Sequence, residues 1–262
     1  MLQRIITGVI AGALFLIMLI IGRWAFAIFA ALMALIAFFE LVAMKKIKRL
    51  SVAGIIGAVF VAVMVLSERL NNEVFHFNMA QVMIVFAVLL LITTVFSKNL
   101  FSFDQAAVTF FSAIYVGFGF HAMVIARDHG LSLVLFILIL IWTTDSGAYF
   151  VGKAFGKHKL APLISPNKTV EGAVGGMVLA VIVAFVFHAI TVPPGLESLT
   201  VLSVIAVAIA VIGQLGDLAE SALKRYYNVK DSGHILPGHG GVLDRCDSWI
   251  FVFPILLAFN VF

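Results

Sequence analysis

Long apolar runs separated by short polar segments dominate the chain from end to end. A helix that spans the hydrocarbon core of a bilayer needs roughly 20 consecutive apolar residues. This template predicts nine helices, over residues 5–22, 24–43, 51–67, 79–97, 105–126, 131–151, 170–190, 199–222 and 246–262. The pattern therefore predicts an all-α, polytopic integral membrane protein.

The distribution of lysine and arginine predicts the orientation of these helices. Cytoplasmic loops carry an excess of both residues. A cytoplasmic amino terminus places all but three of the 17 lysines and arginines on that side, the exceptions being Arg23, Arg69 and Arg127. The two longest polar connections, 152–169 and 224–245, then face the cytoplasm. The first run has no small-residue cleavage site, so we expect a retained helix rather than a removed signal peptide.

Composition agrees with a membrane protein. The chain is 63% hydrophobic and 11% charged, whereas soluble domains are about 45–50% apolar and about 25% charged. Cys246 is the only cysteine, which excludes an internal disulfide. No soluble domain or repeat is recognisable, and no nucleic-acid partner is predicted. We expect a single domain, 1–262, with an apolar part over 1–130 and the polar chemistry within 131–262.

Four polar residues, Asp217, Glu220, Ser221 and Lys224, lie at the end of the run 199–222 and just beyond it. Helix positions three or four apart share a face, so Asp217, Ser221 and Lys224 are predicted to line one stripe. Carboxylates at membrane depth are costly and usually serve a function. We interpret the stripe as a metal or phosphate site at the inner leaflet. The alternative is an ion pair between Glu220 and Lys224 beside a structural aspartate.

A second polar cluster covers 230–247 and opens with Lys230 and Asp231. Its turn, Pro237–Gly241, provides bare backbone whose amides can point at an anion. Asp244 and Asp247 follow at the start of the last apolar run, and two carboxylates at that spacing can share one or two Mg²⁺ ions. The alternative is helix capping, which explains one of the two aspartates.

A third cluster lies between 142 and 172. Asp145 is near the inner end of the sixth run, and Ser165, Lys168 and Thr169 lead into the seventh. Free amides at a helix start favour phosphate. The alternative is a basic loop that sets topology and ends in a capped helix.

Two further polar features have weaker interpretations. Glu40, in the second apolar run, is expected to be interfacial or paired with Lys45. His234 and His239 do not predict a zinc site, because no cysteine lies within reach of them.

Residues 221–247 contain Ser221-Ala-Leu-Lys224-Arg225, Lys230-Asp231, Leu236–Gly241 and Asp244-Arg245-Cys246-Asp247. In order and spacing this segment resembles the signature of the phosphatidate cytidylyltransferase (CDP-diacylglycerol synthase) family. The DSGAYF and SPNKTVEG segments resemble a second motif of that family. Cys246 is a departure, since the family usually has a branched apolar residue or Met there.

The resemblance implies that CTP and phosphatidate give CDP-diacylglycerol and diphosphate, a step in phospholipid biosynthesis. It implies Mg²⁺, as one metal or as one of two, with the second metal divalent or monovalent. It also implies a homodimer in the bacterial cytoplasmic (inner) membrane, multi-pass, with its active site facing the cytoplasm.

The motif match and the clusters together give the candidate residues. The metal carboxylates are Asp217, Asp244 and Asp247. The catalytic residues are Asp217, Lys224, Arg225, Lys230, Asp231, His239, Asp244, Arg245 and Asp247. The substrate-binding residues are Asp145, Ser165, Lys168, Thr169, Ser221, Gly240 and Gly241.

The residues suit this chemistry. A phosphate monoester is mostly dianionic at pH 7, since its second pKa is about 6, so it needs no strong base. The obstacle is charge repulsion, which cations and amides relieve. Two alternatives stay open: a CTP-dependent lipid kinase, which needs a base for its alcohol, and a polytopic transporter, which predicts charges near the midplane in two matching halves.

Overall fold

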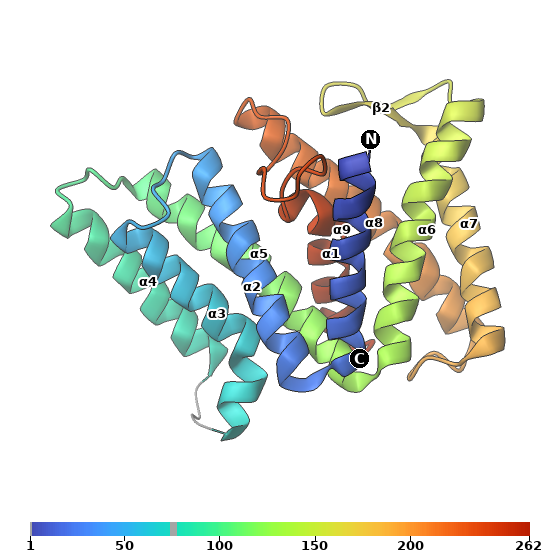
Figure 1. Ribbon diagram of the computed structural model, residues 1–262, viewed down its shortest axis with the longest axis horizontal. Helices are drawn as coiled ribbons and strands as arrows, with labels where there is room; N and C mark the ends of the chain where they lie inside the picture. The colour runs from blue at the N-terminus through green and yellow to red at the C-terminus, as the bar shows by residue number, and fades with distance from the viewer. Residues whose placement is uncertain (1, 74–77) are drawn as a thin grey trace. The chain divides into compact units, whose positions relative to one another are not determined.

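The computed structural model describes residues 2–73 and 78–262, and within them it contains nine α-helices and one β-hairpin (Figure 1). The helices are α1 (Leu2–Ile21), α2 (Arg23–Met44), α3 (Val52–Glu73), α4 (Met79–Phe96), α5 (Phe103–His129), α6 (Leu131–Phe155), α7 (Val170–Ile190), α8 (Leu199–Tyr226) and α9 (Leu243–Ala258). The strands are β1 (Lys159–Ala161) and β2 (Ser165–Thr169). Every apolar run that the sequence indicated contains a helix.

Eight of these helices, α1 to α8, are long and apolar enough to cross a membrane. The chain is thus an all-α polytopic membrane protein, as its pattern predicts. The last predicted span corresponds to α9, which has 16 residues and is not among the eight. Helix α8 continues past the predicted end at 222 to Tyr226, so Lys224 lies on the helix as the predicted stripe requires, and Arg225 also lies in the last turn.

The chain folds as two compact units. The first unit consists of the residues up to Val124 together with Val229–Arg245. The second consists of Ile125–Asn228 together with Cys246–Phe262. The loop before α9 therefore belongs with the amino-terminal helices, although it follows α8 in the sequence.

Aromatic and small side chains pack the helices of the first unit. The rings of Phe60 in α3 and Phe86 in α4 stack with centroids 4.0 Å apart, and Phe110 of α5 lies 5.4 Å beyond Phe86. Helix α2 packs closely on α3, because a Cβ on Gly57 would lie 2.3 Å from the ring of Phe38. These aromatic and aliphatic side chains form an apolar core that excludes polar groups unless they are hydrogen-bonded.

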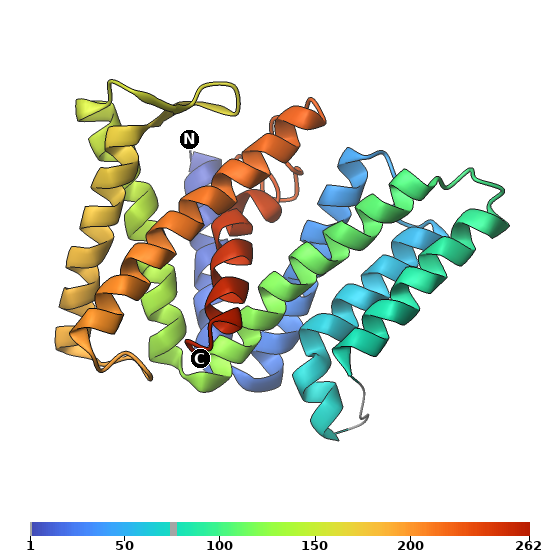
Figure 2. The same cartoon turned by 180° about the vertical axis from the view of Figure 1, so that it is seen from behind.

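Helices α6, α7 and α8 form the second unit with the β-hairpin and most of α9 (Figure 2). Glycines bring α6 and α7 together, since a Cβ on Gly147 would lie 3.0 Å from the Gly176 backbone. Small residues at such interfaces let membrane helices approach closely. The antiparallel hairpin β1–β2 joins these helices, with Lys159 opposite Thr169. The sequence interpretation, which treated 152–169 as a loop, did not foresee it.

Candidate active site

The β-hairpin brings Lys168 to the carboxylate stripe of α8. The Lys168 Nζ lies 2.5 Å from Asp217 Oδ2, and both side chains are partly buried. Thr169 ends β2 and caps α7, because its Oγ1 accepts a hydrogen bond from Gly172 N at 3.1 Å. The predicted capped helix start is therefore present. Ser165 begins β2 at the other end of the strand.

Asp217 is the centre of a group of carboxylates in the second unit. Ser221, one turn further along α8, donates its hydroxyl to Asp217 Oδ1 at 3.3 Å. Asp145 of α6 and Asp247 of α9 are close enough to Asp217 to interact with it electrostatically. Asp247 also accepts a hydrogen bond from Ser248 N at 2.7 Å. Carboxylates this close repel one another unless cations offset their charge.

Lys224 is paired within its own helix. Its ammonium forms an ion pair with Glu220, whose side chain is almost completely buried. The ion pair that the alternative interpretation of this helix end proposed is therefore present. Arg225 is directed to the hairpin, where its Nε donates to the Ile164 carbonyl at 3.4 Å. Of the two cations, Arg225 thus links the end of α8 to the hairpin.

The glycine-rich segment between α8 and α9 forms a tight turn at Pro237-Gly238. His239 N donates to Leu236 O at 2.8 Å, and Gly238 has a φ of 76°. Proline followed by a residue of positive φ is the signature of a type II turn. Leu236 N then donates to Gly240 O at 3.0 Å. The rigid turn that the sequence predicts is therefore present.

Asp244 closes this loop onto the first turn of α9. Its Oδ2 accepts hydrogen bonds from Ser232 N, Ser232 Oγ and Gly241 N, each at 2.8 Å. Asp244 is the second residue of α9 and accepts from residues that precede the helix, so it fastens the loop to the helix and is not the N-cap of the capping alternative. The Gly241 amide, expected to bind substrate, is engaged by this carboxylate.

Glu40 has partners that the sequence did not indicate. It is 3% exposed and therefore buried within the protein. Its carboxylate accepts hydrogen bonds from the amides of Val242 and Leu243 at the start of α9 and from the hydroxyl of Ser232. A carboxylate inside an apolar run was the available signal, since such groups are rarely left without partners. Its partners are too distant in sequence to predict.

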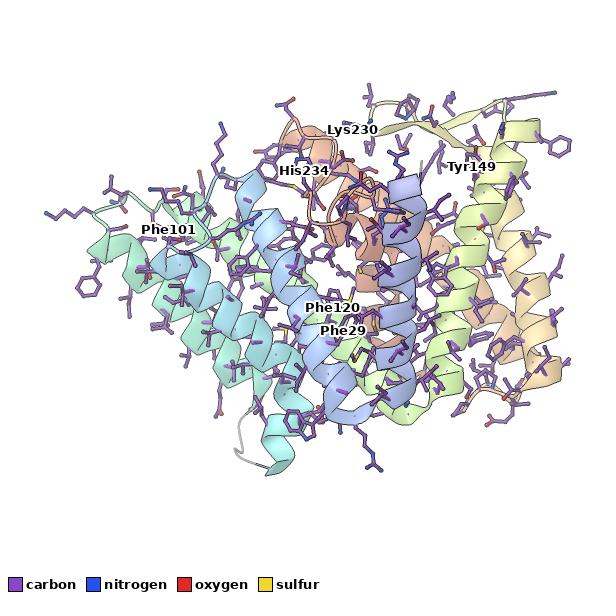
Figure 3. The ribbon with its side chains drawn as sticks, viewed as in Figure 1. Phe29, Phe101, Phe120, Tyr149, Lys230 and His234 are labelled. Carbon is purple, nitrogen blue, oxygen red and sulfur yellow. The ribbon has the colours of Figure 1, made fainter. Side chains whose placement is uncertain are left out.

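A cavity of about 520 Å³ lies in the first unit, between the end of α2 and the segment 229–235. Asp231, Ser232 and His234 contribute polar groups to its wall, and Arg49 contributes a cation. Figure 3 labels His234 and the neighbouring Lys230 on this segment. Lys230 and Arg245 are exposed.

His239 and Gly240 are the remaining predicted catalytic and substrate-binding residues, and both lie in the loop before α9. His239 is partly buried, and its ring lies beside α1, since a Cβ on Gly8 would be 3.2 Å from its Nε2. Gly240 has a φ of 85°, a backbone conformation that favours glycine.

The second unit contains three carboxylates that interact with one another electrostatically. Asp145, Asp217 and Asp247 interact through their charges, and Lys168 is the cation paired with Asp217. Carboxylate oxygens are the ligands that Mg²⁺ prefers. Within residues 2–73 and 78–262, no three His, Cys, Asp or Glu residues lie in an arrangement that would hold a metal.

The comparisons with known proteins agree over nearly the whole chain. A model of the cytidylyltransferase family matches residues 2–262. The phosphatidate cytidylyltransferase of Bacillus subtilis (strain 168) is 46% identical over 260 residues, covering 98% of this chain and 96% of that protein. Those of Staphylococcus haemolyticus (strain JCSC1435) and Staphylococcus aureus (strain COL) are 44% and 43% identical over 253 residues, covering 97% of this chain and 96% of each protein.

Proposed function

The chain belongs to the cytidylyltransferase family, and from this premise we propose a mechanism for its reaction. It is a nucleotidyltransferase that converts CTP and phosphatidate to CDP-diacylglycerol and diphosphate. The observation that carries this assignment is the identity to phosphatidate cytidylyltransferases along 97–98% of the chain.

The reaction is an attack of the lipid phosphate on the nucleotide. A phosphate oxygen of phosphatidate forms a new bond to the α-phosphorus of CTP. The bond between the α-phosphorus and the oxygen that bridges to the β-phosphorus breaks, and diphosphate leaves with that electron pair. The attacking oxygen is already charged at pH 7. Catalysis therefore consists of positioning two anions and offsetting their charge.

Asp217 and Asp247 are the residues that we propose for holding Mg²⁺ in the second unit. Their support is the oxygen donor set and the electrostatic interaction between them. When bound, Mg²⁺ supplies positive charge that offsets the phosphate oxygens. Asp244 is assigned to the metal by the motif, and in the structure its Oδ2 holds the loop before α9.

Lys168 is proposed to bind phosphate oxygens of CTP. It lies on β2 with its ammonium at Asp217, next to Thr169 at the start of α7. An ammonium acts on phosphate as a point charge. The lysine can therefore exchange a carboxylate partner for the nucleotide without leaving the site. Ser221 and Asp145 complete this surface around Asp217.

We propose that the protein lies in the bacterial cytoplasmic membrane, with its amino terminus and active site on the cytoplasmic side. The support is the excess of lysine and arginine in alternate loops. CTP then arrives from the cytosol, and the lipid arrives through the bilayer.

We also propose the homodimer that the family implies. Native mass spectrometry of the protein in detergent checks this oligomeric state.

Accessibility of introduced cysteines tests this orientation. Lys157→Cys and Ile235→Cys should react with a membrane-impermeant maleimide only from the cytoplasmic side, and Ser198→Cys only from outside. The unmodified chain is the background control, because its Cys246 is buried. Labelling with the sides exchanged would contradict the proposed orientation.

Product analysis tests the reaction itself. Purified protein in detergent with CTP, phosphatidate and Mg²⁺ should form a lipid whose mass is that of CDP-diacylglycerol. Replacing CTP by ATP should give little nucleotidyl lipid. Absence of cytidylylated lipid with every divalent cation tested would refute the activity.

A further inference from the structure

Glu40 is a buried charged group that the reaction described above does not use. Its Oε1 accepts a hydrogen bond from Val242 N at 3.0 Å, and its Oε2 accepts from Leu243 N at 2.9 Å. The Ser232 hydroxyl lies 3.0 Å from the same Oε2. These donors lie 192 to 203 residues away in the sequence, all in the segment that carries the family motif.

The arrangement of donors around Glu40 requires a side chain with two acceptor oxygens, which is a carboxylate. Both oxygens of Glu40 face donors, and the first amides of a helix have no partner inside that helix. A buried carboxylate is costly unless it is hydrogen-bonded, and so are unpaired amides. Glu40, from α2, therefore accepts hydrogen bonds from amides at the start of α9 that have no partner within that helix. These amides in turn provide the hydrogen bonds that the buried carboxylate needs.

Ser232 connects Glu40 to the second carboxylate of the segment. Its hydroxyl lies 3.0 Å from Glu40 Oε2 and 2.8 Å from Asp244 Oδ2, and its amide also donates to Asp244. A hydroxyl has one hydrogen, so the two carboxylates share a single donor. The position of Asp244 is thus coupled to that of Glu40.

We propose that Glu40 is a positioning residue of the cytidylyl transfer, acting through Ser232 and through the first amides of α9. It fixes where α9 begins, and α9 continues through Asp247 in its second turn. The proposal rests on the proposed function, because it assumes that this segment takes part in the reaction. A small misplacement of reacting groups can cost about 10²-fold in rate.

Glu40→Gln tests the proposal with little change in shape. The amide puts an NH₂ in place of one oxygen, so a donor then faces a donor. We expect kcat to fall about 10²-fold while the KM values change less than about threefold, since both oxygens of Glu40 are bonded to groups of the protein. Hydrogen exchange should also become faster in peptides that cover 236–248. Glu40→Asp, which keeps both oxygens, should recover part of kcat.

Glu68→Gln is the matched control, because it makes the same substitution at an exposed site in α3 of the same unit. It should keep the kcat and the exchange rates of the unmodified protein. Ser232→Ala provides a second test if Glu40→Gln fails to fold, because it removes one donor and leaves both amides bonded to Glu40. We expect it to lower kcat by about tenfold and to speed exchange in the same peptides.

The exchange measurement separates this proposal from the proposed function. If Glu40→Gln exchanges faster at 236–248 but the unmodified protein has no activity, the cytidylyl transfer is refuted. The positioning role in that reaction is then refuted with it. An active protein in which Glu40→Gln keeps native kcat and exchange would overturn the role of Glu40 alone. If Glu40→Gln does not fold, Ser232→Ala decides. A native kcat and native hydrogen-exchange rates in Ser232→Ala would then overturn the positioning role of Glu40. A rise in KM at unchanged kcat would also overturn it, because that is the signature of a substrate contact.

Discussion

Replacing Asp217 or Asp247 by asparagine should reduce kcat at least about 10²-fold. Each change removes a negative charge that we propose holds the Mg²⁺ ion. Loss of one electrostatic contact to a reacting group typically lowers kcat by at least about 10²-fold. Asparagine keeps the size of the side chain, so both variants should insert into the membrane and purify. Turnover at saturating CTP and phosphatidate, measured across a range of Mg²⁺ concentrations, checks the prediction.

Asp104→Asn is the matched control for these variants. Asp104 is exposed in the first turn of α5 and belongs to the other unit, so its substitution should leave turnover unchanged. Near-native turnover in both Asp217→Asn and Asp247→Asn would refute the metal assignment. Higher Mg²⁺ should partly restore the variants if the carboxylates act by holding the cation.

Lys168→Ala should raise the KM for CTP by roughly 10- to 100-fold. A hydrogen bond to a charged group is worth about 1.5–3 kcal/mol, and every 1.4 kcal/mol is a factor of ten. The KM for phosphatidate should change much less. Added salt should raise the KM of the unmodified protein, because partly exposed charges are screened, and this dependence should weaken in the variant.

Lys159→Ala makes the same substitution at an exposed position of β1 and serves as the control. It removes a positive charge from the hairpin without removing the cation at Asp217. If Lys168→Ala raises only the KM for phosphatidate, the hairpin holds the lipid head group and not the nucleotide. If Lys168→Ala and Lys159→Ala raise the KM for CTP equally, the hairpin attracts CTP by its overall positive charge and Lys168 makes no specific contact with it.

The helices could be predicted from the sequence because membrane helices depend on local composition. Each apolar run satisfies its own backbone hydrogen bonds, so its length and hydropathy are enough to identify it. The end of α8 was less predictable. The apolar run indicated an end at 222, whereas the helix continues to Tyr226 with Glu220 and Lys224 paired within it.

Long-range interactions explain what the sequence could not reveal at the site. The motif indicated Asp217, Asp244 and Asp247 together, but it could not distinguish their surroundings. In the structure Asp244 is engaged with Ser232 and Gly241, whereas Asp247 bonds to the adjacent amide of Ser248. Glu40 was underestimated for the same reason, since its partners are about 200 positions away.

The fate of the phosphates of CTP tests the proposed reaction most directly. Purified protein should be given phosphatidate, Mg²⁺ and CTP labelled at either the α- or the γ-phosphate. Attack on the α-phosphorus predicts that the α label enters the lipid and that the γ label leaves in diphosphate. Transfer of the γ label to lipid, with the α label left in CDP, would instead identify a lipid kinase and contradict the proposed mechanism.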